Sequence, residues 1–205
     1  MLVYTALILA VGTLYLSAAE GGTQCKQVSA KTDFDKKQYF NEVWYVTHYK
    51  DENPGQYSGK YCSIFAAQMS DKSINEAVCH YKPDDKSTIY DVSRVTEESG
   101  KYTAYYKKVD EKGNEIKGMD INNNKYTVTV MEADRSSALI HICLQRGDEN
   151  LGDLYAILNR QKDVDASDVI KNTLSKTGLT LSEFSSTKGI GCEYNEGTLI
   201  SLLEK

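Results

Sequence analysis

The hydrophobic pattern of this chain is mostly that of β-strands. Between Lys125 and Ala133, Tyr and Val alternate with Thr, and this period of two is typical of a strand with one buried face. The segment from Tyr39 to Tyr49 is rich in aromatic and β-branched residues, as strands are. Similar segments at spacings of about 8–20 residues, joined by turn sequences, predict further strands over 61–69, 75–81, 88–92, 101–109, 115–119, 137–145 and 152–158.

This succession of strands favours an up-and-down antiparallel β-barrel, with an open β-sandwich as the alternative. The pattern changes over 167–177, where apolar residues fall at helical spacing between Ser167 as N-cap and Gly178 as C-cap. We expect this helix to pack outside the barrel and a short second helix to cover 181–184. A barrel of eight strands encloses side chains or one small ligand, which is the architecture of a ligand carrier.

The N-terminal segment differs from the rest of the chain. Met1 to Ala19 contain no Asp, Glu, Lys or Arg, and an apolar run over 6–16 is followed by small residues. These features predict a secretory signal peptide over 1–19, which leaves 20–205 as a single domain. A membrane anchor is the alternative, but the apolar run is shorter than the roughly 20 residues of a spanning helix.

Composition narrows the class of protein. The 205 residues include 40% hydrophobic residues, which suffices for a packed core, and the net charge of -5 argues against a general nucleic-acid binder. No nucleophile–base arrangement typical of a hydrolase is visible in the sequence. The five cysteines predict two disulfides and one free thiol in an oxidising compartment, with the pairing left open at this point. Their spacing does not suit a structural zinc site.

Several stretches carry a resemblance to a known family. They are Tyr39-Phe40 with 43–47, then 76–81, 136–144 and 151–155. Through them the chain resembles the lipocalins and, within the lipocalins, the nitrophorins, haem-containing nitric oxide carriers in the saliva of blood-feeding insects. The resemblance covers essentially the whole chain, signal peptide included. It implies an all-β fold, an eight-stranded antiparallel lipocalin barrel with a C-terminal α-helix packed outside. One departure is Glu42, because lipocalins usually place Gly two residues before Trp44.

The resemblance implies that His80 is the proximal haem ligand. A neutral imidazole is a good iron donor, and a single axial protein ligand leaves the sixth iron position open for a small gas molecule. Strand alternation puts Val78 on the same face as His80, beside the haem, and Cys79 on the opposite face. We interpret His48 and His141 as structural or surface residues.

The resemblance also implies the rest of the pocket. Its cofactor-binding residues would be Tyr61, Val78, Ile89, Tyr126, Leu144 and Leu154, with Asp91 at the pocket edge near the haem propionates. The alternative is that these are ordinary core residues of the barrel, which is the preferred interpretation of Ile89 or Leu144 taken alone, and that Asp91 is a solvated strand-end residue.

Two loops are implied to close the pocket. Asp51 opens the loop 51–56, and Leu151 ends a second loop over 145–151. A protonated Asp51 can donate a hydrogen bond to a carbonyl of the other loop, whereas the ionised form cannot. The resemblance therefore implies that nitric oxide is held at low pH and released near neutral pH. An ordinary acidic surface loop is the alternative.

The resemblance further implies the disulfide pairing. It joins Cys25 to Cys143 and Cys62 to Cys192, which leaves Cys79 as the free thiol. Cys79 then faces away from the haem. We expect it to be buried beneath the helix over 167–177, with an exposed thiol that links two chains as the alternative.

Two function classes follow. The resemblance implies a secreted ferric haem lipocalin with one haem b per chain, which stores nitric oxide, delivers it as a vasodilator and binds histamine at the iron. It implies a carrier rather than an enzyme, with weak haem-dependent redox activity such as nitrite dismutation, a host coagulation factor as a partner in one branch, and a monomer or weak dimer. The alternative is a haem-free salivary lipocalin that sequesters biogenic amines, which needs carboxylates facing the cavity instead of an iron ligand.

Overall fold

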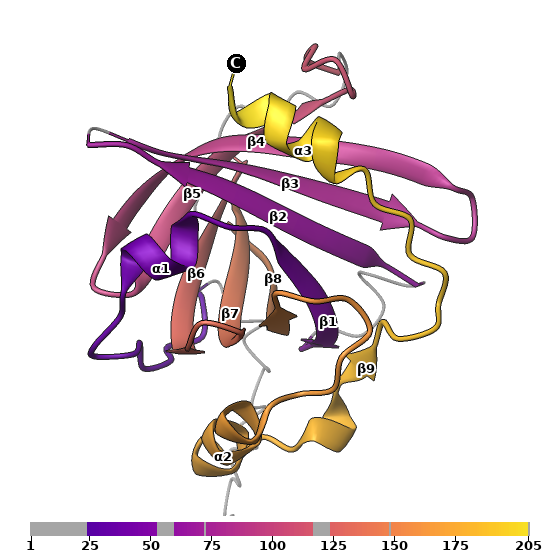
Figure 1. The fold of residues 1–205 in the computed structure, drawn as a ribbon. Coiled ribbons are helices and arrows are strands. Elements are labelled where there is room, and N and C mark those ends of the chain that lie inside the picture. The colour runs from indigo at the N-terminus through magenta and orange to yellow at the C-terminus, as the bar shows by residue number, and fades with distance from the viewer. Residues whose placement is uncertain (1–23, 53–59, 72, 117–123, 148, 205) are drawn as a thin grey trace, which may run out of the picture.

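The chain folds into a closed antiparallel β-barrel, as the strand pattern predicts (Figure 1). The computed structural model describes residues 24–52, 60–71, 73–116, 124–147 and 149–204, so the expected signal peptide over 1–19 lies outside the described residues. The barrel strands are β1 (Trp44–Asp51), β2 (Cys62–Met69), β3 (Ile74–Lys82), β4 (Ser87–Glu98), β5 (Lys101–Val109), β6 (Asn124–Ala133), β7 (Ser137–Arg146) and β8 (Glu149–Asn159). Each pairs with the next, and β1 closes the barrel by pairing with both β8 and β2.

The first predicted strand begins later than the sequence pattern indicated. Its first two residues, Tyr39 and Phe40, instead end the helix α1 (Lys36–Phe40). The Asp35 carboxylate caps this helix by accepting hydrogen bonds from the backbone N–H groups of Lys37 and Gln38. Tyr39 and Phe40 are both buried, which an alternating strand with one buried face does not allow. Of the predicted strand over 115–119, Glu115 forms only an isolated bridge with Val109, and 117–119 lie outside the described residues.

One end of the barrel is plugged by aromatic side chains. Tyr39, Phe40 and Trp44 are fully buried, and the indole N–H of Trp44 donates to the Tyr39 carbonyl at 2.9 Å. The Arg160 guanidinium lies 3.3 Å from the centre of the Trp44 ring, a cation–π contact. Glu42, the departure from the lipocalin pattern, pairs with Arg160 at 3.3 Å on the outside of this closed end.

Helices cover two outer faces of the barrel (Figure 1). The expected helix is α2 (Asp168–Lys176), which begins at an N-cap Ser167 and packs against β6 and β7. Gly178 follows it with φ +76°, the left-handed conformation typical of a glycine after a helix. The 3₁₀ turn Leu181–Glu183 and the short β9 (Ser185–Ser186), which pairs with β1, come next.

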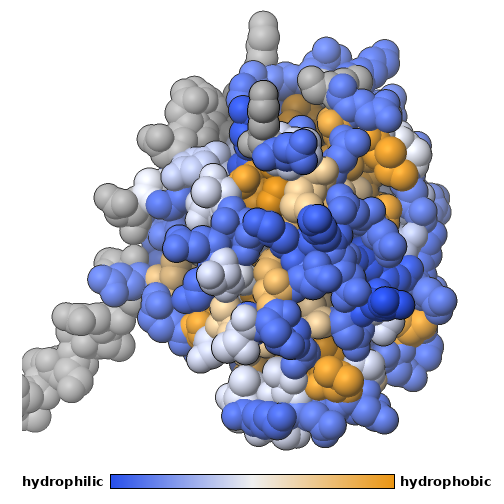
Figure 2. Space-filling view, turned by 60° about the vertical axis from the view of Figure 1, so that its left-hand side comes forward, coloured by the Kyte–Doolittle hydropathy of each residue, from blue (hydrophilic) through white to orange (hydrophobic). Residues whose placement is uncertain are grey.

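A further helix, α3 (Glu196–Leu203), lies across β2, β3 and β4 and was not expected from the sequence. Asn195 caps it by accepting a hydrogen bond from the Thr198 N–H at 3.0 Å. Leu199 and Leu202 are its buried residues. No helix in the described part of the chain is long and apolar enough to cross a membrane. On the face seen in Figure 2 the surface is mainly hydrophilic, with hydrophobic side chains in small separate groups.

The two disulfides are those that the resemblance implies. Cys25–Cys143 fastens the N-terminal segment to β7, and Cys62–Cys192 fastens the C-terminal tail to the start of β2. Cys79 is the free thiol and is fully buried. The position expected for it was wrong, because α3 and not α2 covers it, and the exposed alternative is excluded by its burial.

Candidate functional site

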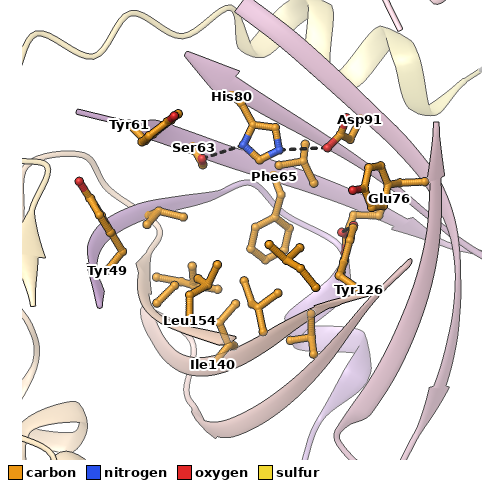
Figure 3. Close-up of a pocket in the computed structure, with 18 of the residues that line it drawn as sticks. Tyr49, Tyr61, Ser63, Phe65, Glu76, His80, Asp91, Tyr126, Ile140 and Leu154 are labelled. Carbon is orange, nitrogen blue, oxygen red and sulfur yellow. Dashed lines mark hydrogen bonds and ion pairs between the residues drawn. The ribbon is translucent and has the colours of Figure 1, made fainter. Parts of the chain in front are cut away.

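The barrel encloses a cavity of about 380 Å³, a size that suits a small ligand. Most of its wall is apolar or aromatic and comes from all eight barrel strands. Polar groups lie at two depths, near the mouth around His80 and near the plugged end around Glu76 (Figure 3). The wall includes Val46, Tyr49, Phe65, Tyr102, Tyr106, Val128, Ile140, Ile142, Ala156 and Leu158.

His80 points into the cavity from β3. Its Nδ1 lies 3.0 Å from the Ser63 hydroxyl on β2, and its Nε2 lies 3.2 Å from the Asp91 carboxylate on β4 (Figure 3). Strand pairing produces this arrangement, because Ser63 is directly opposite His80 in the β2–β3 register. The imidazole is therefore held at both nitrogens while its side chain stays 39% exposed.

Asp91 connects His80 to a lysine. The carboxylate is almost completely buried and accepts a hydrogen bond from the Lys108 ammonium at 2.9 Å. Burial alone would raise the pKa of Asp91, but the contacts with His80 and Lys108 outweigh burial and hold that pKa below its ordinary value. The mouth of the cavity thus carries a row of imidazole, carboxylate and ammonium groups on three adjacent strands.

The residues predicted for the pocket come together in this structure. All of them face the same cavity as His80, namely Tyr61, Val78, Ile89, Asp91, Tyr126, Leu144 and Leu154. His48 and His141 do not line this cavity. His48 is buried beside Thr47 at 3.1 Å, and His141 is buried with its Nε2 2.8 Å from the Asp153 carboxylate. Burial lowers the pKa of both histidines, as expected for structural residues.

The expected pocket loops are only partly as predicted. Asp51 faces the cavity, but as the last residue of β1 rather than the first of a loop, and most of 51–56 lies outside the described residues. The predicted loop over 145–151 is wrong, because β7 and β8 extend into it and leave a tight turn at Gly147. Leu151 is the extra residue of a β-bulge in β8, where the register with β7 shifts.

Glu76 is one of the polar cavity residues that sequence reasoning missed, together with Ser63 and Lys108. It is 3% exposed and lies deeper than His80 on the same face of β3. One carboxylate oxygen, Oε1, accepts a hydrogen bond from the Tyr126 hydroxyl, whereas Oε2 has no hydrogen-bond partner among the described residues. Burial raises the pKa of Glu76 to about 7, although the hydroxyl groups of Tyr126 and Tyr102 partly offset this effect.

The arrangement suits two kinds of ligand. Among the described residues, no group of three or more His, Cys, Asp or Glu side chains is placed to hold a bare metal ion. A single imidazole on an apolar wall suits a metal that already has other ligands, as iron in a porphyrin does. Buried carboxylates on the same wall suit a cationic ligand.

Comparisons with known proteins place the chain in a family. The family model described as Nitrophorin matches residues 25–202. Nitrophorin-3 of Rhodnius prolixus is 41% identical over 197 residues, which cover 94% of this chain and 96% of that protein.

Solved structures with a similar fold support this family assignment. A biogenic amine-binding protein superimposes with a TM-score of 0.75 at 28% identity, covering 88% of this chain and 96% of its own. The tryptamine complex of the amine binding protein of Rhodnius prolixus gives 0.76 at 28% identity, with 88% and 95% covered. A cockroach allergen at 13% identity, with 82% of this chain and 96% of its own covered, shares the fold alone, with a TM-score of 0.58. The chain therefore belongs to the nitrophorin family and is a ligand-carrying lipocalin.

Proposed function

We propose that this chain is a secreted ferric haem protein that stores and delivers nitric oxide, with His80 as the proximal ligand of one haem b. The observation that carries the proposal is the orientation of His80, whose ring faces a largely apolar cavity while Ser63 holds Nδ1. A partner on one ring nitrogen fixes the ring and leaves the other nitrogen for the metal, as second-shell partners of ligating histidines usually do. Membership of the nitrophorin family supports the same assignment.

The residues of the cavity fit a haem. Apolar walls suit the porphyrin faces, and the Lys82 and Lys108 side chains on the cavity wall suit its propionates. The Nε2 of His80 would exchange its 3.2 Å contact with Asp91 for the iron, and Lys108 would remain to partner the Asp91 carboxylate. When bound, the haem would supply an iron able to bind nitric oxide. The chain's own part is to donate one imidazole, orient it and exclude water.

The proposal extends to ligand exchange. Histamine contains an imidazole, the same type of iron donor as His80, so we include it as a second ligand at that position. Asp51 faces the cavity from the end of β1 and Leu151 lies in the bulge of β8, and we retain both as the pair that closes the mouth at low pH. Two disulfides and an apolar leader sequence support secretion, and the saliva of a blood-feeding insect is the source that we propose.

Replacing the proposed ligand tests the haem assignment. We expect His80→Ala to abolish stable haem binding while far-UV circular dichroism stays that of a folded barrel. His48→Ala is the matched control, because His48 lies outside the cavity and its loss should leave the Soret band unchanged. An unchanged Soret spectrum and haem affinity in His80→Ala would show that the assignment is wrong.

A second candidate function is the carriage of biogenic amines without haem. The observation that favours it is the set of three carboxylates on the cavity wall, from Asp51, Glu76 and Asp91. The solved tryptamine complex of an amine binding protein, 28% identical to this chain, supports the same ligand class. Isothermal titration of tryptamine into the protein without added haem tests it, and the absence of binding heat at millimolar ligand would exclude it.

A further inference from the structure

We propose that Glu76 is the anchor for the ammonium group of a primary arylalkylamine, which enters the barrel amine first and packs its ring above the plugged end. The proposal rests on the second candidate function and adds the binding residue and the direction of the ligand. It concerns the deep end of the cavity, four residues along β3 from His80.

The first argument is the free hydrogen-bonding capacity of the carboxylate. A buried carboxylate oxygen without a partner is costly, and proteins normally satisfy such a group. Glu76 is 3% exposed and lines the cavity, and its Oε2 lacks a partner among the described residues while Oε1 is held by Tyr126. An ammonium group offers three donors and a positive charge, which is what Oε2 lacks.

The second argument is the aromatic surroundings of Glu76. The hydroxyl groups of Tyr126 and Tyr102 lie beside the carboxylate, and the hydroxyl oxygens of Tyr39 and Tyr102 are 3.4 Å apart. Phe65 lies in the same cavity wall as Glu76 and Tyr126 (Figure 3). Aromatic faces attract cations and also pack well against a flat ring. The deep wall therefore suits a ligand that combines an ammonium with an aromatic body, rather than a carboxylate or a sugar.

The third argument is the distance from the mouth. Glu76 and His80 are four residues apart on one strand, so their Cα atoms are about 13 Å apart along β3. Val78 lies between them on the same face and is apolar. An amine anchored at Glu76 is thus separated by Val78 from His80, whereas Asp91 lies opposite Val78 on β4, at a depth between the two.

The charge of Glu76 gives the proposal a pH signature. The titratable groups around the carboxylate are Tyr39 from α1, Tyr102 from β5 and Tyr126 from β6, and burial raises the pKa of all three tyrosines, so they stay neutral near pH 7. With a pKa of about 7, Glu76 becomes ionised between pH 6 and 8. An alkylammonium stays charged throughout that range. The affinity for the amine should therefore rise with pH.

The experiment compares a charged ligand with a neutral ligand of the same shape. Tryptamine and its alcohol analogue, 3-(2-hydroxyethyl)indole, are titrated calorimetrically into the full-chain protein without haem at pH 6, 7 and 8. We expect Glu76→Gln to weaken tryptamine binding about 10- to 100-fold at pH 8, as loss of a charge-assisted hydrogen bond does, and to change binding of the alcohol little. The rise of tryptamine affinity with pH should disappear in the Glu76→Gln variant. That loss would assign the pH dependence to Glu76. Glu111→Gln, at an exposed turn, is the control for the change in net charge.

Each other outcome has a definite meaning. Equal weakening of both ligands in Glu76→Gln, or unchanged tryptamine affinity, overturns the proposal. If Asp91→Asn weakens tryptamine and Glu76→Gln does not, the amine binds at the mouth, so the proposal fails and the amine carrier stands. Failure of the parent protein to bind tryptamine refutes both.

If Glu76→Gln does not fold, Tyr126→Phe serves instead. It keeps the carboxylate but removes the donor to Oε1, so the pH at which tryptamine affinity rises should move upward. An unmoved pH profile overturns the proposal.

Discussion

Glu76 should make the free energy of unfolding decrease as the pH rises towards 7. Its pKa in the folded chain is about 7, against an ordinary value of 4.5, because burial disfavours the carboxylate. The folded state therefore binds this proton more tightly than the unfolded state does. The resulting stabilisation is complete below about pH 4.5 and is lost as the pH rises to about 7. The difference corresponds to about 3 kcal/mol.

Replacement by glutamine removes this proton while keeping the shape of the side chain. Whatever its effect at pH 5, we expect Glu76→Gln to gain about 2.5 kcal/mol relative to the parent protein between pH 5 and 8. Urea denaturation at four pH values, with both disulfides intact and followed by fluorescence of the buried Trp44, measures this change. Exposed Glu111→Gln should show no such trend. A difference between Glu76→Gln and the parent that stays constant from pH 5 to 8 would refute the reasoning.

Three further predictions concern other parts of the chain. Cys79 should resist iodoacetamide in the folded protein and react in 6 M guanidinium, because it is buried and burial raises its pKa to about 11; fast alkylation of the folded protein would contradict its position. Leu199→Ala should lower the free energy of unfolding by about 2–5 kcal/mol in urea denaturation and make Cys79 reactive. Ile200→Ala on the same helix, where the side chain is 47% exposed, should lower it little, and equal losses would mean that α3 is not packed as described. Asp51→Asn should change the rate of nitric oxide release, because Asp51 faces the cavity from the end of β1, and release rates identical to those of the parent would exclude a role for Asp51 in closing the mouth.

Strand alternation predicts which residues of β3 face the cavity. The period of two places Val78 and His80 on one face of β3, and both face the cavity. The same period reaches Glu76, two residues before Val78, so a charged residue at an inward position was visible in the sequence. The contacts of His80 with Ser63 and Asp91 could not be predicted in this way, because they depend on the registers of β2 and β4 against β3.

The helices were harder to predict, for a physical reason. α2 has a cap at each end and one apolar stripe, so its sequence pattern is clear. α3 has eight residues, of which four are Leu or Ile, and a short apolar run does not distinguish a helix from a strand. Its position depends on tertiary contacts, since Leu199 and Leu202 pack against Ala77 and Cys79 on β3 and Cys62–Cys192 holds the preceding tail. The error about what covers Cys79 follows directly from missing α3.

The two depths of the cavity differ in how far the chain satisfies its own polar groups. At the mouth, His80 has Ser63 and Asp91, and Asp91 has Lys108, so an arriving ligand must replace contacts that already exist. Near the plugged end, the described residues give Oε1 of Glu76 a hydrogen bond from Tyr126 and leave Oε2 without one, so an ammonium group arriving there adds a contact to Oε2. Replacement of existing hydrogen bonds yields little net free energy, whereas satisfying a buried unpaired group yields much more. We therefore expect the mouth to favour a ligand that forms a strong new bond, as the proposed iron would with His80, and the deep end to favour a small amine held by one carboxylate.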